Sequence, residues 1–131
     1  MPEVIRGFMK RESNELSAGK ITVPQMFILC YLYKEKSARM TDIARHLYVT
    51  TAAATGLVDR LVKLDLVARE YDASDRRIIK IVLSSKGSAL FQKIWKQKVA
   101  RVQEVFCKIP EQERVEYLRI LRKIKETIEQ E

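Results

Sequence analysis

Few side chains in this sequence are typical of catalysis. The 131-residue chain has one histidine, His46, and two cysteines, Cys30 and Cys107, which lie far apart in the sequence. The sequence contains no glycine-rich phosphate-binding loop and no cysteine and histidine cluster with the spacing of metal ligands. We therefore expect neither an enzyme nor a bound cofactor or metal ion.

The three residues also have simple structural interpretations. His46 falls near the end of a predicted helix, where a surface or capping role is favoured over chemistry. Cys30 has apolar neighbours, which disfavour the thiolate and favour an inert core residue over an oxidant sensor. Cys107 stands beside Lys108, whose charge favours a thiolate, but apolar neighbours also offer packing partners. Packing is the preferred interpretation for both cysteines, with oxidant sensing as the alternative.

A different chemistry, the recognition of nucleic acid by hydrogen bonds, fits residues 50–56. Hydroxyl groups can bond phosphates or base edges, methyl groups can contact a thymine methyl, and small side chains let a helix approach DNA closely. The alternative is that a string of alanines simply packs against a neighbouring helix. The candidate residues are Thr50, Thr51, Ala52, Ala53, Thr55 and Gly56.

A second candidate group lies in the polar run 72–77, where Arg76 and Arg77 stand beside Asp72 and Asp75. In such a run one carboxylate can orient one guanidinium while another arginine enters a narrow minor groove. The alternative is a solvated turn, whose surface ion pairs contribute at most about 1 kcal/mol. The elements around the two groups favour the first interpretation.

The hydrophobic pattern places both groups on defined elements. Apolar residues at helical spacing predict three central helices, with Thr22, Thr41 and Thr50 as their N-caps. The third helix ends at Asp65, which tolerates left-handed backbone geometry. Runs rich in β-branched residues, starting at Val67 and at Ile78, flank the polar loop and predict a hairpin.

Two short helices joined by a tight turn and followed by a hairpin make a winged helix-turn-helix. We predict a mainly α fold with a small β-hairpin wing, flanked by a short helix over residues 4–16 and two long helices before and after Pro110. The terminal helices carry too much apolar surface for one small domain. Tyr48 departs from the usual pattern, because glycine is commoner at this turn. Residues predicted to join the two short helices into one core are Ala44, Leu47, Val49, Ala54 and Leu57.

Charge and composition favour a polyanionic partner. Twenty-five Lys and Arg residues against 17 Asp and Glu residues give a net charge of +8, which favours nucleic acid. Composition does not locate the binding face, because residues 86–108 hold six basic residues and one acid, while residues 50–80 hold six and five. The sequence has no apolar run long enough to span a membrane and no secretory signal, so we expect a cytoplasmic protein.

The run VTTAAATGLVDRLVKLDLVAREYDASDRRIIKIVLSSKG resembles the signature of the MarR family, in which a recognition helix precedes a wing containing Asp-x-Arg. The upstream segments ITVPQMFILCYL and MTDIARHL resemble the second and third helices of the family, so the resemblance covers residues 21–87. It implies a ligand-responsive repressor of transcription that binds a pseudo-palindromic operator in double-stranded DNA as a homodimer. Residues 21–85 then form the DNA-binding part, and residues 1–20 and 86–131 the dimerisation helices of a single unit.

The resemblance also implies individual roles. It assigns Arg77 to the minor groove and Asp75 to its support, and places residues 50–56 and Arg60 on or near the DNA-facing side. Arg69 and Lys80 are either wing-strand contacts or internal pairs. Asp65 stands where the family usually has glycine, and the segment before Thr22 is shorter than usual.

A cleft for a small aromatic effector is implied as well, between the dimerisation helices and the winged part. Met26, Cys30 and Tyr31 are candidates for its wall, although apolar helix residues more often belong to the core. The alternative function is a winged-helix module that binds an acidic protein through the basic helix from Lys86, or an architectural DNA-binding module without an effector.

Overall fold

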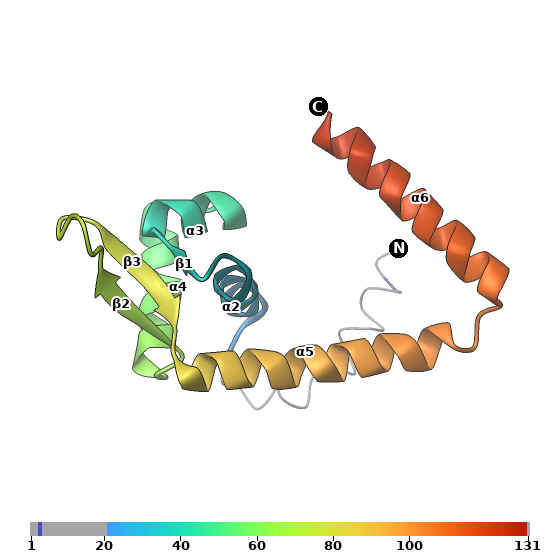
Figure 1. Cartoon of the computed structure of the whole chain (residues 1–131), viewed down its shortest axis with the longest axis horizontal. Helices are drawn as coiled ribbons and strands as arrows, with labels where there is room; N and C mark the ends of the chain where they lie inside the picture. Colours follow the sequence, from blue (N-terminus) through green and yellow to red (C-terminus); the bar gives the residue numbers. More distant parts are fainter. Residues whose placement is uncertain (1–2, 4–20, 131) are drawn as a thin grey trace. The chain divides into compact units, whose positions relative to one another are not determined.

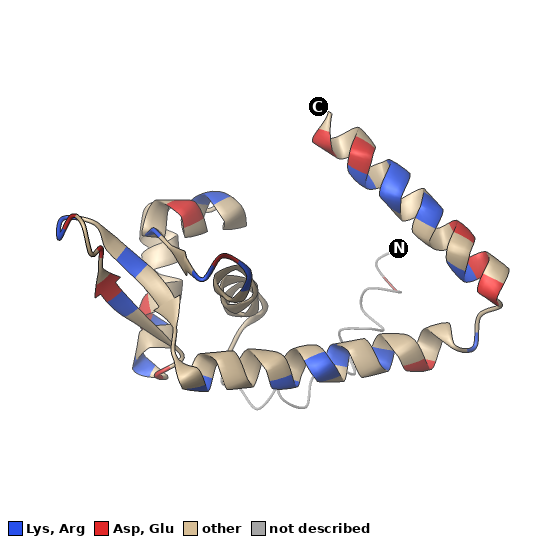
Figure 2. Cartoon of the chain, in the orientation of Figure 1, with Lys and Arg blue, Asp and Glu red and all other residues tan. Residues whose placement is uncertain are grey.

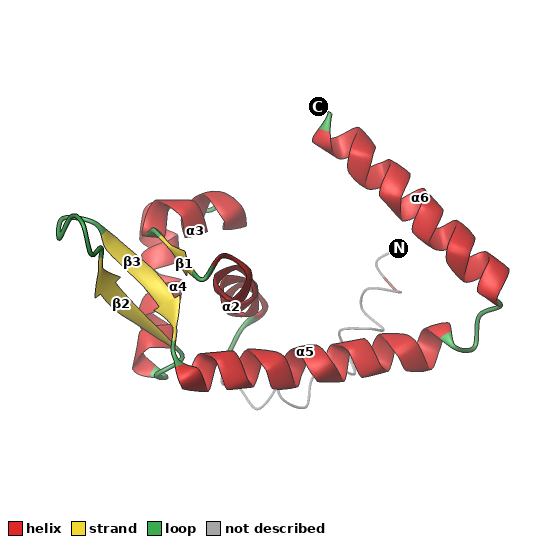
Figure 3. Ribbon diagram, in the orientation of Figure 1, coloured by secondary structure: helices red, strands yellow, loops and turns green. Residues whose placement is uncertain are grey.

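The computed structural model describes residue 3 and residues 21–130, and the predicted helix over residues 4–16 lies outside them. Residues 1–95 and residues 96–131 form two compact units, which are described separately. The predicted mainly helical fold with a β-hairpin is confirmed (Figure 1; Figure 3). In chain order the elements are α2 (Val23–Glu35), β1 (Ser37–Ala38), α3 (Met40–Leu47), α4 (Thr51–Lys63), β2 (Val67–Tyr71), β3 (Ile79–Leu83), α5 (Ser85–Phe106) and α6 (Glu111–Glu129).

Thr22 is the N-cap of helix α2, as the sequence predicts, and it forms a capping box with Gln25. The Thr22 hydroxyl accepts a hydrogen bond from the Gln25 backbone N–H at 3.4 Å, and the Gln25 side chain accepts one from the Thr22 N–H at 2.8 Å. Two of the N–H groups that a helix start leaves unpaired are thereby satisfied. The helix then buries Ile28, Leu29 and Leu32 in the core.

The start of α3 differs from the prediction. Thr41 is not the N-cap, because the helix already begins at Met40, with Arg39 as the preceding cap residue. The Asp42 carboxylate accepts a hydrogen bond from the Arg39 N–H at 3.1 Å, so the cap residue lies two positions before the predicted one. A reciprocal bond from the third helical residue therefore defines this end.

Helix α4 follows a tight turn and begins where the sequence predicts. The Thr50 hydroxyl accepts a hydrogen bond from the Ala53 N–H at 3.1 Å, so Thr50 is the N-cap. After the last helical residue, Asp65 has a φ of 58°, which confirms the predicted left-handed end.

The strands form one antiparallel sheet in the order β1, β3, β2. Strands β2 and β3 pair from Val67 opposite Leu83 to Tyr71 opposite Ile79, which confirms the hairpin. Strand β1 pairs Ser37 with Val82 and was not predicted, because two residues show no alternation that a sequence pattern can detect. We call β2, β3 and the loop between them the wing.

The core of the first unit lies between α2, α3, α4, the sheet and the start of α5. Ala44 and Ala54 are buried as predicted, and Leu47 and Leu57 pack partly buried against the core. The prediction for Val49 is wrong, since this residue is 39% exposed in the turn between α3 and α4. The buried apolar side chains are Ile21, Met26, Ile28, Leu29, Leu32, Ala38, Ile43, Ala44, Ala54, Val58, Leu61, Leu66, Val67, Ile81, Phe91 and Ile94.

The start of α5 is held tightly against the segment that follows α4. Gly87 lies so close to it that an added Cβ would be 1.9 Å from the carbonyl oxygen of Leu66. The Ser84 hydroxyl donates to the Asp65 carbonyl at 2.5 Å, and the Lys86 ammonium donates to the Leu64 carbonyl at 3.1 Å. A side chain at position 87 would therefore push the two segments apart.

The second unit contains the end of α5 and all of α6. Helix α6 buries none of its side chains, although many are apolar. The rings of Phe106 and Tyr117 pack with their centroids 5.6 Å apart. Among the described residues, no helix is long and apolar enough to cross a membrane. The exposed apolar side chains of α6 are Val115, Leu118, Ile120, Leu121, Ile124 and Ile128.

Candidate nucleic-acid interface

Helix α4 has one buried and one exposed face. Ala54, Val58 and Leu61 recur at spacings of four and three residues and are completely buried, so they fix the helix against the core. The opposite face carries the small residues predicted to approach DNA. Exposed on α4 are Thr51, Ala52, Ala53, Gly56 and Arg60, while Thr55 is half-buried.

The first turn of α4 offers hydrogen-bond donors and no negative charge. It contains no acidic residue, so the positive end of the helix dipole is unopposed there. The Thr55 hydroxyl donates to the Thr51 carbonyl at 2.8 Å, so its hydrogen is used within the helix while its oxygen can still accept. A Cβ added at Gly56 would meet nothing within 4 Å. Packing among the described residues therefore does not require glycine at position 56.

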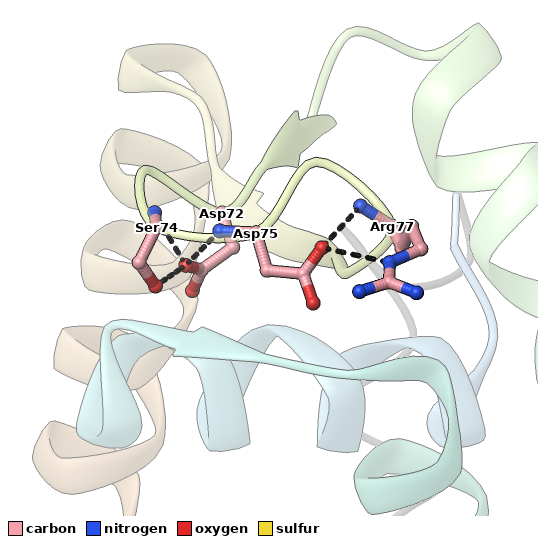
Figure 4. A network of polar contacts seen from close by, with 4 residues as sticks. All are labelled: Asp72, Ser74, Asp75 and Arg77. Carbon is pink, nitrogen blue, oxygen red and sulfur yellow. Dashed lines mark hydrogen bonds and ion pairs between the residues drawn. The ribbon is translucent and has the colours of Figure 1, made fainter.

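In the wing, Asp72 organises the loop (Figure 4). Its carboxylate accepts hydrogen bonds from the Ser74 N–H at 2.9 Å and from the Ser74 hydroxyl at 2.5 Å. The Lys80 ammonium lies 2.7 Å from its other oxygen. Lys80 and then Ser74 hold the pKa of Asp72 well below its ordinary value. The loop is therefore tied to β3 by a charged hydrogen bond.

Asp75 and Arg77 form the pair that the sequence suggested. The Asp75 carboxylate accepts from the Arg77 backbone N–H at 3.0 Å and from its Nε at 3.3 Å (Figure 4). This ion pair uses neither terminal nitrogen of the guanidinium, and the Arg77 side chain is 92% exposed. Arg76 is exposed as well. The loop thus presents arginine to the solvent with one guanidinium already oriented.

Arg69 and Lys80 each form an ion pair with an aspartate of this chain, which is one of the two alternatives that the family resemblance implied. Arg69 of β2 is bonded to Asp59 of α4, and Lys80 of β3 to Asp72. The first pair joins the wing to the exposed side of α4. Figure 2 shows the acidic and basic residues interleaved on these elements, which agrees with their nearly balanced charge.

Sequence reasoning missed a surface at the α3–α4 turn. A cavity of about 370 Å³ there is lined by Tyr31, Asp42, Arg45, His46 and Tyr48. His46 is exposed, as predicted, and its ring stacks on Tyr31 with centroids 4.3 Å apart. Tyr48 is 96% exposed. The one sign of this surface in the sequence was Tyr48, which stands at a turn where glycine is commoner.

The remaining candidates are the three predicted ligand-wall residues of α2 and Cys107, which follows α5. Met26 is buried, so it belongs to the core and not to a cleft wall, and Cys30 and Tyr31 are half-buried against the same core. Cys107 is exposed and its thiol donates to the Glu104 carbonyl at 3.1 Å. Within the described part of one chain, Cys107 therefore does not have the packing that the sequence predicts. No described cluster of His, Cys, Asp and Glu residues has a geometry that would hold a metal ion.

Comparison with known proteins gives a consistent result. Residues 21–79 match the MarR family model. The HTH-type transcriptional repressor MdtR of Bacillus subtilis is 28% identical over 109 residues, which cover 83% of this chain and 70% of MdtR. A MarR family protein from Bacillus stearothermophilus has a TM-score of 0.85 and 24% identity, covering 97% of this chain and 89% of that one. A mutant of S. aureus MepR bound to an oligodeoxyribonucleotide has a TM-score of 0.72 and 23% identity, covering 97% and 94%.

Proposed function

Because the chain belongs to the MarR family of transcriptional regulators, we propose that it is a homodimeric repressor that binds duplex DNA and responds to a ligand. The observation that carries the proposal is the pairing of two groups on one unit. The first is the exposed small-residue face of α4, and the second is Arg77, oriented by Asp75 at the tip of the wing. A cytoplasmic location follows from this function.

In this proposal α4 enters the major groove and the wing enters the adjacent minor groove. Arg77 reads the narrow groove through its exposed guanidinium, since such grooves concentrate negative potential. Asp75 holds the arginine, and Arg76 contributes charge nearby. The proposed DNA-binding residues are Thr50, Thr51, Ala52, Ala53, Thr55, Gly56, Arg60, Asp75, Arg76 and Arg77.

The homodimer is supported by the second unit. Helix α6 exposes Leu121, Ile124 and Ile128 along one side, and such an apolar stripe on a helix that buries nothing of its own calls for a partner. We assign residues 1–20 and 86–131 to dimerisation, and residues 21–85 to DNA binding. Two copies then present two α4 helices to successive major grooves, about 34 Å apart.

The effector is a small aromatic compound in this proposal. A cavity of about 550 Å³ lies within the first unit, beside the end of α2 and the start of α5, and its size suits such a ligand. Tyr33 offers a ring, Lys36 a positive charge, and Ser88 and Gln92 polar groups. These residues replace the buried Met26 as candidates for the ligand wall.

The experiment is selection of DNA by the full chain from a random duplex pool, followed by binding measurements on the selected sequence. We expect a pseudo-palindromic site whose affinity falls steeply with salt. Arg77→Ala should weaken binding about tenfold, within the range for a base or groove contact. Lys123→Ala, which removes one charge from α6, is the matched control and should change affinity less than twofold.

Two outcomes would contradict the proposal. Binding without sequence preference would support the architectural alternative. Weak binding that neither salt nor Arg77→Ala changes would support the protein-interaction alternative.

A further inference from the structure

Tyr48 combines a left-handed backbone conformation at the end of α3 with an exposed aromatic ring. Its φ is 56°, in the left-handed region that disfavours side chains with a Cβ. Its side chain is 96% exposed, so the described part of the chain does not cover the ring. A large aromatic residue in an unfavourable backbone conformation, without packing in return, indicates a role outside the fold.

The other two described non-glycine residues with positive φ do have local explanations. Lys36 ends α2, and its ammonium lies 5.3 Å from the centre of the Tyr33 ring. Asp65 is a short polar residue, a type that tolerates this region, and its carbonyl accepts a hydrogen bond from Ser84. Tyr48 likewise ends its helix, α3, but it is a large side chain that stays 96% exposed.

The position of Tyr48 indicates which partner it would meet. Its backbone N–H donates to the Arg45 carbonyl at 3.2 Å and closes α3, and Thr50, two residues later, caps α4. Tyr48 therefore stands at the entrance of the helix proposed to enter the major groove. In a helix-turn-helix, the first helix crosses the DNA backbone and the second lies in the major groove, so a residue that ends the first helix lies near the backbone.

The neighbours of Tyr48 are mostly hydrogen-bond donors. Arg45 is 81% exposed along its side chain and lies 3.9 Å from Asp42, too long for a strong pair. His46 is exposed beside it. Asp42 is the one acidic residue lining this cavity. A phenol and a guanidinium at one edge suit an anionic and partly apolar partner, as a sugar–phosphate strand is.

We infer that Tyr48 contacts the DNA backbone beside the major groove, with its hydroxyl donating to a phosphate oxygen and its ring packing against a deoxyribose. Arg45 supplies a positive charge to a neighbouring phosphate. Such contacts position a protein on DNA without reading sequence. This inference rests on the proposed function, because it requires α4 to be the recognition helix.

The test compares Tyr48→Gly, Tyr48→Asn and Tyr48→Phe in the full chain. Gly and Asn both accept the left-handed conformation, so both variants should fold. Melting temperature, oligomeric state and DNA affinity are measured, the last on the selected duplex and on an unrelated duplex at several salt concentrations. Tyr117→Phe, outside the proposed DNA-binding residues, is the matched control for loss of a hydroxyl; it keeps the ring that packs on Phe106, and with the oligomeric state unchanged it should bind DNA as the unaltered chain does.

We expect Tyr48→Gly to melt about 4 °C or more above the unaltered chain, because backbone strain is removed. The Gly and Asn variants should bind both duplexes about tenfold more weakly, and Tyr48→Phe should lose about threefold through the missing hydrogen bond. Arg45→Ala should lower the salt slope by about one, whereas Tyr48→Phe, which removes no charge, should leave it unchanged.

The inference is overturned if Tyr48→Gly and Tyr48→Asn bind DNA as the unaltered chain does while Arg77→Ala loses affinity; the proposed function then stands. If neither Tyr48 nor Arg77 matters, the proposed function itself fails. Lower stability of Tyr48→Gly would give the ring a role in the fold, and a changed oligomeric state would assign it to contacts between copies. Loss on the selected duplex alone would indicate base reading in place of backbone contact.

Discussion

Gly56 allows a test in which the stability of the fold and DNA binding should change in opposite directions. It lies within α4 on the exposed face, and an added Cβ meets nothing within 4 Å. Alanine is favoured over glycine in a helix by about 1 kcal/mol, and no clash offsets this gain. Gly56→Ala should therefore raise the free energy of unfolding by about 1 kcal/mol and the melting temperature by about 4–8 °C.

Gly87→Ala is the matched control for stability. The same methyl group at this position would stand 1.9 Å from the Leu66 carbonyl oxygen, which is backbone and cannot turn away. The start of α5 would have to shift, and we expect a loss of about 3 kcal/mol. Urea unfolding of both variants at one fixed protein concentration measures the two changes, since stability of a dimer depends on concentration.

The DNA affinity of Gly56→Ala should fall, although its stability rises. A small residue in the first half of a recognition helix lets its backbone approach the base edges, and a methyl group there takes up that space. We expect about tenfold weaker binding to the selected duplex, equivalent to about 1.4 kcal/mol. Fluorescence anisotropy with labelled duplex measures this change.

Two results would refute this reasoning. A variant that is more stable and binds DNA equally well would show that this face of α4 does not approach the bases. A variant that is less stable would show that glycine is needed for packing, which the empty surroundings of Gly56 argue against.

Three further predictions follow from the ion pairs and exposed surfaces. Asp72→Asn should lower the free energy of unfolding at neutral pH. Because folding depresses the pKa of Asp72, its stabilisation is present above the ordinary pKa of 3.8 and is lost as the pH falls below it. In urea titrations, the stability difference between the variant and the unaltered chain should therefore shrink below about pH 4. A difference that stays constant with pH would exclude the charged bond to Lys80. Leu121→Asp should turn the dimer into monomers in sedimentation experiments, because it places a charge in the apolar stripe of α6; an unchanged mass would remove α6 from the interface. Asp65→Gly should raise the melting temperature, since glycine has no Cβ to oppose its φ of 58°, and a lower melting temperature would give the Asp65 side chain a structural role.

The features that could be predicted from the sequence depend on neighbouring residues. Thr22 and Thr50 cap helices because a hydroxyl reaches an N–H three residues ahead, which is visible in the sequence alone. The start of α3 was mispredicted because Asp42 makes the reciprocal bond without a hydroxyl at the cap. Strand β1 escaped notice because its pairing to β3 is a tertiary contact of two residues.

The candidate site also has features that the sequence predicts and features that depend on tertiary contacts. The run of two aspartates and two arginines suggested only that an acid orients an arginine, and the family resemblance, not the run itself, named Asp75 as that acid. Asp75 forms an ion pair with Arg77, and Asp72 forms one with Lys80. The pair between Arg69 and Asp59 requires the packing of β2 on α4, which no sequence spacing reveals.

The contact at Gly87 has a consequence for regulation. Because Gly87 has no side chain, the start of α5 lies directly against the carbonyl of Leu66. Ser84 and Lys86 also bond the start of α5 to the carbonyls of Asp65 and Leu64, which follow α4. We expect a displacement of the first turn of α5 to move the residues that follow α4, and the ion pair between Arg69 and Asp59 connects α4 to the wing. We therefore expect the proposed DNA-binding surface to move together with the start of α5.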